Sequence, residues 1–140
     1  MIGIILAGYG DFAKGLYSDL SLLAGGKPEA MKCVGFGQED ATDDFEYKLR
    51  DAIKDLDDCE SILMLVDATG HAPYRTALEV KKKYETKKDI EIVAGVNVGM
   101  LVSINLARAY VSSLSDLADM AVEEGVKNVV RYVPSEYDDE

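Results

Sequence analysis

The chain has 140 residues, 48% of them apolar, which is typical of one globular domain with a sizeable core. Its formal net charge of −11 argues against nucleic acid and anionic membranes as partners, because no basic stripe is available to neutralise phosphates. Cys33 and Cys59 match no metal-binding spacing, so we expect no metal, no cofactor and a reducing, cytoplasmic setting. The apolar start Met1–Ala7 is too short to insert into a membrane.

Strand-like apolar runs alternate with helical spacing along the first half of the chain. The expected elements are, in order, a strand over Ile2–Ala7 broken by Gly8-Tyr9-Gly10, a helix capped by Asp11 and ended by Gly25-Gly26, a strand over Met31–Phe36, and a helix opened by Thr42 or Asp43. Asp55–Glu60 then forms a polar loop that leads to the centre of the chain.

The stretch Ser61–Pro73 is the best candidate for chemistry. Ile62–Val66 is an unbroken apolar run, typical of a strand buried on both faces of a parallel sheet. Asp67 ends this run, and a loop of small residues leads to His71, the only histidine in the chain. Polar groups just past the end of such a strand lie where open α/β sheets bind their ligands.

The second half continues the alternation. The expected elements are a helix with Pro73 in its first turn, a strand over Ile90–Ala94, a turn over Gly95–Gly99, a helix through Met100, Ile104, Ala107 and Val111, a helix capped by Ser113 or Ser115, and a last strand over Val126–Val133. We expect residues 1–133 to form one domain and residues 134–140 to be a mobile acidic tail.

The alternation of strands and helices predicts the fold class. We expect an α/β protein with a doubly wound, mostly parallel sheet of four core strands, helices on both faces and a C-terminal edge strand. If the first and third strands are neighbours, the loops at Gly8–Gly10 and Asp67–His71 line one crevice at the topological switch point.

That crevice is suited to an anion. Helix-start amides and backbone exposed at small residues bind phosphate well, and the candidate residues are Gly8, Gly10, Thr69, Gly70 and Ala72. A carboxylate beside an imidazole fixes the tautomer of the ring, so Asp67 and His71 suit phosphoryl transfer to a nitrogen nucleophile.

Simpler interpretations remain open for each residue. Gly8-Tyr9-Gly10 alone is a strand-to-helix turn. Asp67 is as well suited to accepting hydrogen bonds from the backbone amides of its own loop as to orienting a histidine. A single loop histidine is more often a surface residue than a catalyst. The sequence has no GxGxxG, GxxxxGK[ST] or GxSxG motif, which disfavours dinucleotide sites, P-loop nucleotidases and hydrolase triads.

Three blocks resemble a known family. They are Ile2–Gly10 followed by GDFAKGL, LVDATGHAP at Leu65–Pro73, and IVAGVNVGML at Ile92–Leu101. The chain resembles, over nearly its whole length, the mannose-type enzyme IIA of the bacterial phosphoenolpyruvate–sugar phosphotransferase system (PTS). The resemblance implies a doubly wound fold and a homodimer joined by the C-terminal strands, here Val126–Val133. It also implies a role in sugar uptake, in which a histidine takes a phosphoryl group from the phosphocarrier HPr and passes it to a IIB component.

One position departs from the family. The phosphorylated histidine of such proteins falls in a His-Gly pair after the first strand, where this chain has Tyr9. A phenol is a poor nucleophile at neutral pH, because its ordinary pKa is near 10. Asp67 matches the family's carboxylate, whereas His71 stands where the family has a small residue, often glycine.

This departure leaves several hypotheses. Either His71 is the acceptor in a rewired relay, or the acceptor has been lost and the chain is a regulatory or partner-binding module that uses the HPr-facing surface. A small-anion sensor using the glycine loop is a further alternative, and a substitution engineered at Tyr9 is another.

Overall fold

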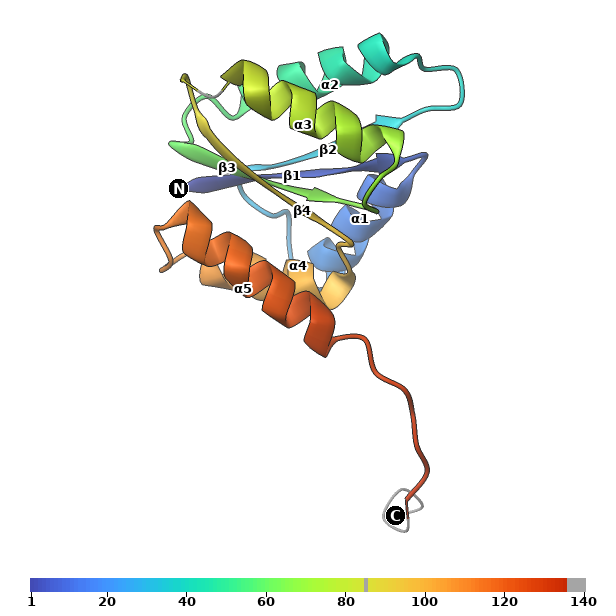
Figure 1. Ribbon diagram of the computed structural model, residues 1–140. Helices are drawn as coiled ribbons and strands as arrows, with labels where there is room; N and C mark the ends of the chain where they lie inside the picture. Colours follow the sequence, from blue (N-terminus) through green and yellow to red (C-terminus); the bar gives the residue numbers. More distant parts are fainter. Residues whose placement is uncertain (85, 136–140) are drawn as a thin grey trace.

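The computed structural model describes residues 1–84 and 86–135, and in them the chain forms one sheet flanked by helices (Figure 1). The four strands are all parallel in the order β2-β1-β3-β4. They are β1 (Ile2–Tyr9), β2 (Met31–Phe36), β3 (Ser61–Val66) and β4 (Asp89–Ala94). β1 and β3 lie at the centre, which explains their unbroken apolar sequences, because both of their faces are covered.

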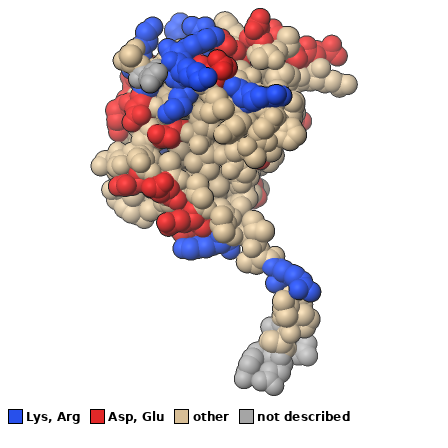
Figure 2. Space-filling view, in the orientation of Figure 1, with Lys and Arg blue, Asp and Glu red and all other residues tan. Residues whose placement is uncertain are grey.

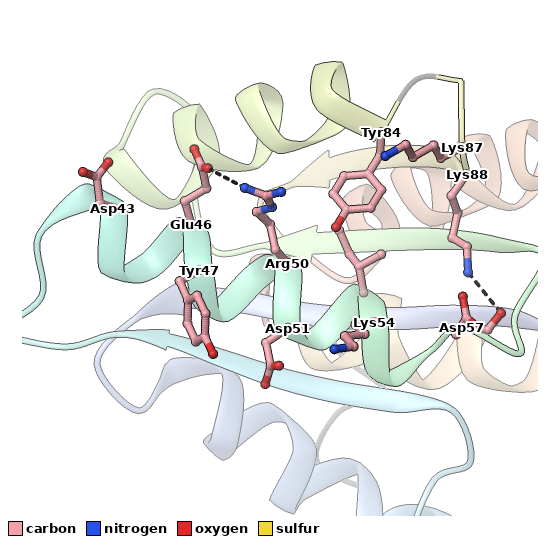
Figure 3. A pocket seen from close by; sticks show the side chains of 11 residues that line it. Asp43, Glu46, Tyr47, Arg50, Asp51, Lys54, Asp57, Tyr84, Lys87 and Lys88 are labelled. Atoms are coloured by element: carbon pink, nitrogen blue, oxygen red, sulfur yellow. Dashed lines mark hydrogen bonds and ion pairs between the residues drawn. The ribbon is translucent and has the colours of Figure 1, made fainter.

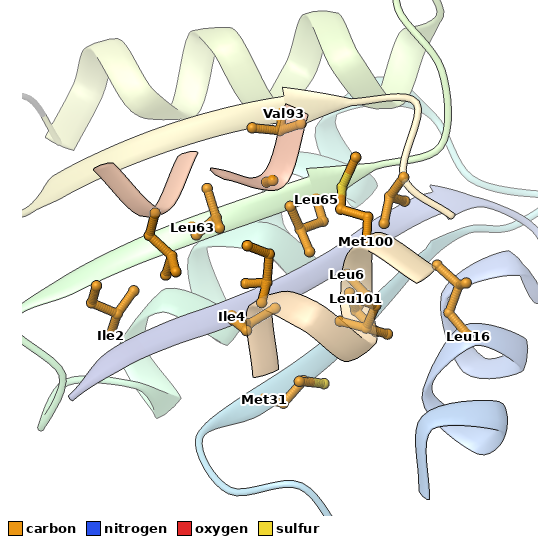
Figure 4. Packing of buried hydrophobic residues seen from close by; sticks show 14 of the residues in the cluster. Ile2, Ile4, Leu6, Leu16, Met31, Leu63, Leu65, Val93, Met100 and Leu101 are labelled. Carbon is orange, nitrogen blue, oxygen red and sulfur yellow. The ribbon is translucent and has the colours of Figure 1, made fainter. Parts of the chain in front are cut away.

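Helices cover both faces of the sheet. They are α1 (Phe12–Ala24), α2 (Thr42–Asp55), α3 (Ala72–Tyr84), α4 (Val98–Ala107) and α5 (Leu114–Lys127). α1, α4 and α5 pack on one face around Leu6, Leu65 and Leu101 (Figure 4). α2 and α3 pack on the other face, around Phe45 and Met64. The predicted doubly wound α/β class is confirmed.

Local signals account for several helix ends. Gly25 adopts the left-handed conformation, with φ of 75°, and ends α1 as predicted. Ser113 caps α5, since its side chain accepts a hydrogen bond from the Asp116 amide. Asp11 occupies the cap position of α1 but makes no side-chain hydrogen bond there, so this part of the prediction is wrong.

The predicted strand over Val126–Val133 is absent from the single chain. Val126 and Lys127 continue α5, and residues 128–135 have no regular structure and extend away from the domain (Figure 1). A strand needs a hydrogen-bonded neighbour, and within the chain this segment pairs with neither edge of the sheet. The predicted tail largely falls on residues 136–140, which lie outside the described residues.

Across residues 1–84 and 86–135, none of the helices is both long enough and apolar enough to span a bilayer.

Candidate functional site

The carboxyl ends of β1 and β3 lie side by side, as the sequence predicts. The Asp67 amide donates to the Ala7 carbonyl (3.0 Å), which continues the pairing of the two strands beyond β3. The Asp67 carboxylate then joins the two loops: Oδ2 accepts from the Tyr9 amide (3.1 Å) and Oδ1 from the Ala68 amide (2.8 Å). Asp67 therefore fixes the backbone of Tyr9 relative to the β3–α3 loop.

An aromatic cluster surrounds the Tyr9 side chain, which is 45% exposed. Its ring centroid lies 5.3 Å from that of Phe36 and 6.1 Å from that of His71, the latter in an edge-on arrangement. Phe36 in turn packs on the buried Phe45, with centroids 5.1 Å apart. Sequence reasoning missed Phe36, although a residue ending the second strand in register with Tyr9 could have indicated it.

His71 lies at the same edge but is not joined to Asp67. Its side chain is exposed, and the interaction found for its ring among the described residues is the contact with Tyr9. Its backbone carbonyl accepts from the Arg75 amide and so opens α3. The structure thus brings Tyr9, Asp67 and His71 to one edge, while the Asp67 oxygens bind backbone amides rather than the imidazole.

The candidate anion-binding residues fall into two groups. Gly10, Thr69 and Gly70 are exposed beside Tyr9 and His71, and both glycines have positive φ, 56° and 79° respectively. Ala72 is half-buried at the start of α3, and Gly8 is buried. The exposed group lies at the surface of the carboxyl edge, whereas Gly8 is buried against Asp67 and Phe12.

Gly8→Ala is expected to loosen this edge. An added Cβ would lie 2.9 Å from Cβ and Cγ of Asp67 and 2.9 Å from Cδ2 of Phe12, so Asp67 has to move. We expect a loss of about 1–3 kcal/mol of unfolding free energy, as for other overpacked sites. Chemical denaturation measures it, and Gly15→Ala is the control, because open space surrounds that glycine on an exposed part of α1. Equal stability of the Gly8 and Gly15 variants contradicts the prediction.

A hollow of about 740 Å³ lies elsewhere, along α2 and the end of α3 (Figure 3). Some of its charged groups bind one another or the backbone: Arg50 lies 3.7 Å from Glu46, and Lys88 donates to the Asp57 carbonyl. This pattern is typical of a solvated ion-pair surface, and the hollow contains none of the predicted site residues.

A doubly wound parallel sheet with its candidate side chains at the carboxyl edge defines a class, the single-domain α/β proteins that bind ligands or partners at a topological switch point. Within that class, the chain belongs to the family of the PTS system fructose IIA component, which matches residues 3–122. The resemblance to mannose-type IIA proteins is thereby confirmed.

Two curated relatives are similar in sequence. The PTS system mannose-specific EIIAB component of Escherichia coli (strain K12) is 29% identical over 128 residues, covering 91% of this chain and 38% of that protein. The PTS system fructose-specific EIIA component of Bacillus subtilis (strain 168) is 27% identical over 117 residues, covering 84% of this chain and 77% of that protein. The chain therefore spans well under half of the E. coli protein.

Two solved structures of IIA proteins are similar to this chain in fold. The PTS component EIIA from Streptococcus agalactiae superposes with a TM-score of 0.85 at 28% identity, covering 94% of this chain and 97% of that one. The mannose/sorbose-specific IIA subunit from Enterococcus faecalis gives a TM-score of 0.84, with 96% of each chain covered; at 22% identity this likeness supports the fold alone.

Proposed function

We propose that this chain serves a PTS for sugar uptake in the cytoplasm as a IIA-type module that binds HPr or a IIB component through the carboxyl edge of its sheet. One observation carries the proposal: the Tyr9 ring is exposed at this edge, at the position where the resemblance places the acceptor histidine, and Asp67 accepts from the Tyr9 amide. The edge presents an exposed aromatic ring that packs against Phe36, which suits protein binding.

Binding to HPr tests this proposal. Tyr9→Ala should weaken the HPr complex at least about tenfold in calorimetry, because a central aromatic side chain often contributes more than 1.4 kcal/mol. Tyr47→Ala is the matched control, since Tyr47 is exposed on α2 within the hollow of Figure 3. No detectable HPr or IIB binding by the unchanged chain contradicts the proposal, as do equal affinities of the two variants.

The second candidate function is a rewired relay. His71 is exposed at the same edge, with its ring against Tyr9, so its imidazole is accessible to a phosphorylated donor. In such a relay a ring nitrogen of His71 forms the new N–P bond as the N–P bond to the HPr histidine breaks. The phosphoryl group is then transferred to the IIB component. No covalent bond to Tyr9 is needed.

Phosphorylation distinguishes the two functions. The chain is incubated with phosphoenolpyruvate, enzyme I and HPr, and its intact mass is followed. The binding module predicts no added phosphoryl group, whereas the relay predicts an acid-labile group that disappears in His71→Ala. Label that persists in His71→Ala contradicts both.

The proposal includes a homodimer through the C-terminal segments. Residues 128–133 leave the domain in an extended path, and Val129, Val130, Tyr132 and Val133 are all exposed. Such β-branched and aromatic side chains favour a strand, and a second copy offers the sheet edge that the single chain does not use.

A further inference from the structure

The sheet has two edge strands, β2 and β4. In each of them, the residues that direct their backbone N–H and C=O groups away from the sheet can be identified. Within a strand, the N–H and C=O groups of alternate residues point to opposite sides. The Gly95 amide donates to Val66 of β3, so Ile90, Ile92 and Ala94 direct their backbone groups to the free side of β4.

The same argument applies to β2. The Gly10 amide donates to the Phe36 carbonyl, which therefore faces β1. Met31, Cys33 and Gly35 consequently direct their backbone groups to the free side of β2. Each free edge thus exposes three residues that an added strand could pair with.

A lysine from the covering helix binds one outward-facing carbonyl on each edge. Lys48 of α2 donates to the Gly35 carbonyl (3.2 Å) and is held by Asp40 at 2.6 Å. Lys81 of α3 donates to the Ile90 carbonyl, while its nearest carboxylate, that of Glu91, lies 3.9 Å away. Lys48, beside the β2 edge, is therefore held by a close ion pair. Lys81, beside the β4 edge, has only the more distant carboxylate of Glu91 to hold it.

The surroundings of the edges also differ. A groove of about 590 Å³ follows β2 and is lined by charged side chains such as Lys14, Lys32 and Asp55. Beside β4, Figure 2 shows an uncharged surface between α3 and α5, whereas the hollow at the start of the strand is lined by Lys81, Lys82, Lys88 and Asp89.

Two exposed side chains of α5, Val122 and Val126, extend that surface. They lie on the flank opposite Glu124, which contacts Ser103 of α4. A segment carrying Val129, Val130 and Val133 matches this apolar edge and not the charged groove.

We propose that Lys81 guards the β4 edge against the C-terminal segment of a second copy. Its ammonium occupies the free side of the Ile90 carbonyl, so an incoming strand pairs with Ile92 and Ala94 and extends to Ile90 only when Lys81 leaves. This inference rests on the proposed homodimer and names the residue that limits its strength. Lysine on an edge strand is a common device against uncontrolled pairing.

Lys81→Met removes the ammonium and keeps an unbranched side chain. Sedimentation velocity over a concentration series should show a dimer dissociation constant at least about fivefold lower than in the unchanged chain. Lys82→Met is the matched control, because Lys82 lies on the same helix turn, is exposed and pairs with Glu79; it should leave the constant unchanged. In amide hydrogen exchange, Ile90 should become protected in the Lys81→Met dimer.

The outcomes separate the proposed homodimer from the proposed role of Lys81. A dimer that protects Ile92 and Ala94 but has the same dissociation constant in Lys81→Met supports strand exchange and overturns the role of Lys81. A dimer that leaves the β4 amides unprotected overturns both, as does a chain that stays monomeric with and without the substitution. A monomeric chain that dimerises in Lys81→Met supports both.

Discussion

Arg108→Met is expected to lower the free energy of unfolding by about 3 kcal/mol, because one buried and three part-buried acceptors lose a charged donor at once. Arg108 is only 5% exposed and lies at the end of α4. Its guanidinium donates to the carbonyls of Ile2 (3.0 Å), Ala30 (3.1 Å) and Glu29, and to Oδ1 of Asn105 (3.0 Å). Burial lowers the pKa of Arg108, but the group stays charged, and these neutral oxygens replace its water.

Arg108 also supports a strained turn. Ala30 has a φ of 50°, which is unfavourable for a residue with a Cβ, and its carbonyl accepts from both Ile4 and Arg108. Urea unfolding of Arg108→Met measures the loss. Arg50→Met is the control, since Arg50 is half exposed and its pair with Glu46 contributes at most about 0.5 kcal/mol. A loss below about 1 kcal/mol for Arg108→Met would mean that water replaces the guanidinium.

Local sequence signals were sufficient to predict most of the fold. The apolar run Ile62–Val66 and the helical spacing of Phe45, Leu49 and Ile53 correspond to burial in the structure, because each pattern depends on an element's own geometry. Residues 126–133 show the limit of such signals: their β-branched side chains favour a strand, but a strand also needs a partner, and the chain alone supplies none.

The candidate site was predictable in its location and not in its contacts. The sequence pattern predicts a doubly wound sheet but leaves its strand order open, and it is the observed adjacency of β1 and β3 that brings Tyr9 and Asp67 together. Whether the Asp67 carboxylate accepts from a backbone amide or from an imidazole depends on the conformation of the loop. The spacing of apolar residues carries no information about that conformation. The role of Arg108 was equally hidden, because its carbonyl partners are remote in sequence.

Tyr9→His is expected to turn the chain into a phosphoryl acceptor, and it has the largest effect on activity that the site allows. The substitution places an imidazole at the position that the resemblance assigns to the acceptor histidine, on a backbone whose amide at position 9 donates to Asp67. An imidazole offers a neutral ring nitrogen as the nucleophile, whereas a phenol is a poor nucleophile until it loses its proton. The rate of phosphorylation by HPr should therefore rise at least about a hundredfold.

The measurement is the appearance of an acid-labile phosphoryl group in the intact mass of the variant, with phosphoenolpyruvate, enzyme I and HPr present. The double variant Tyr9→His, His71→Ala is the control that assigns the group to position 9, since the introduced ring is then the only imidazole in the chain. Adding Asp67→Asn should slow the transfer, because a side-chain amide has only one oxygen to accept from the two backbone amides, at positions 9 and 68, that the carboxylate holds. If the variant binds HPr and still takes no phosphoryl group, an imidazole at position 9 is not sufficient for transfer and the prediction is wrong.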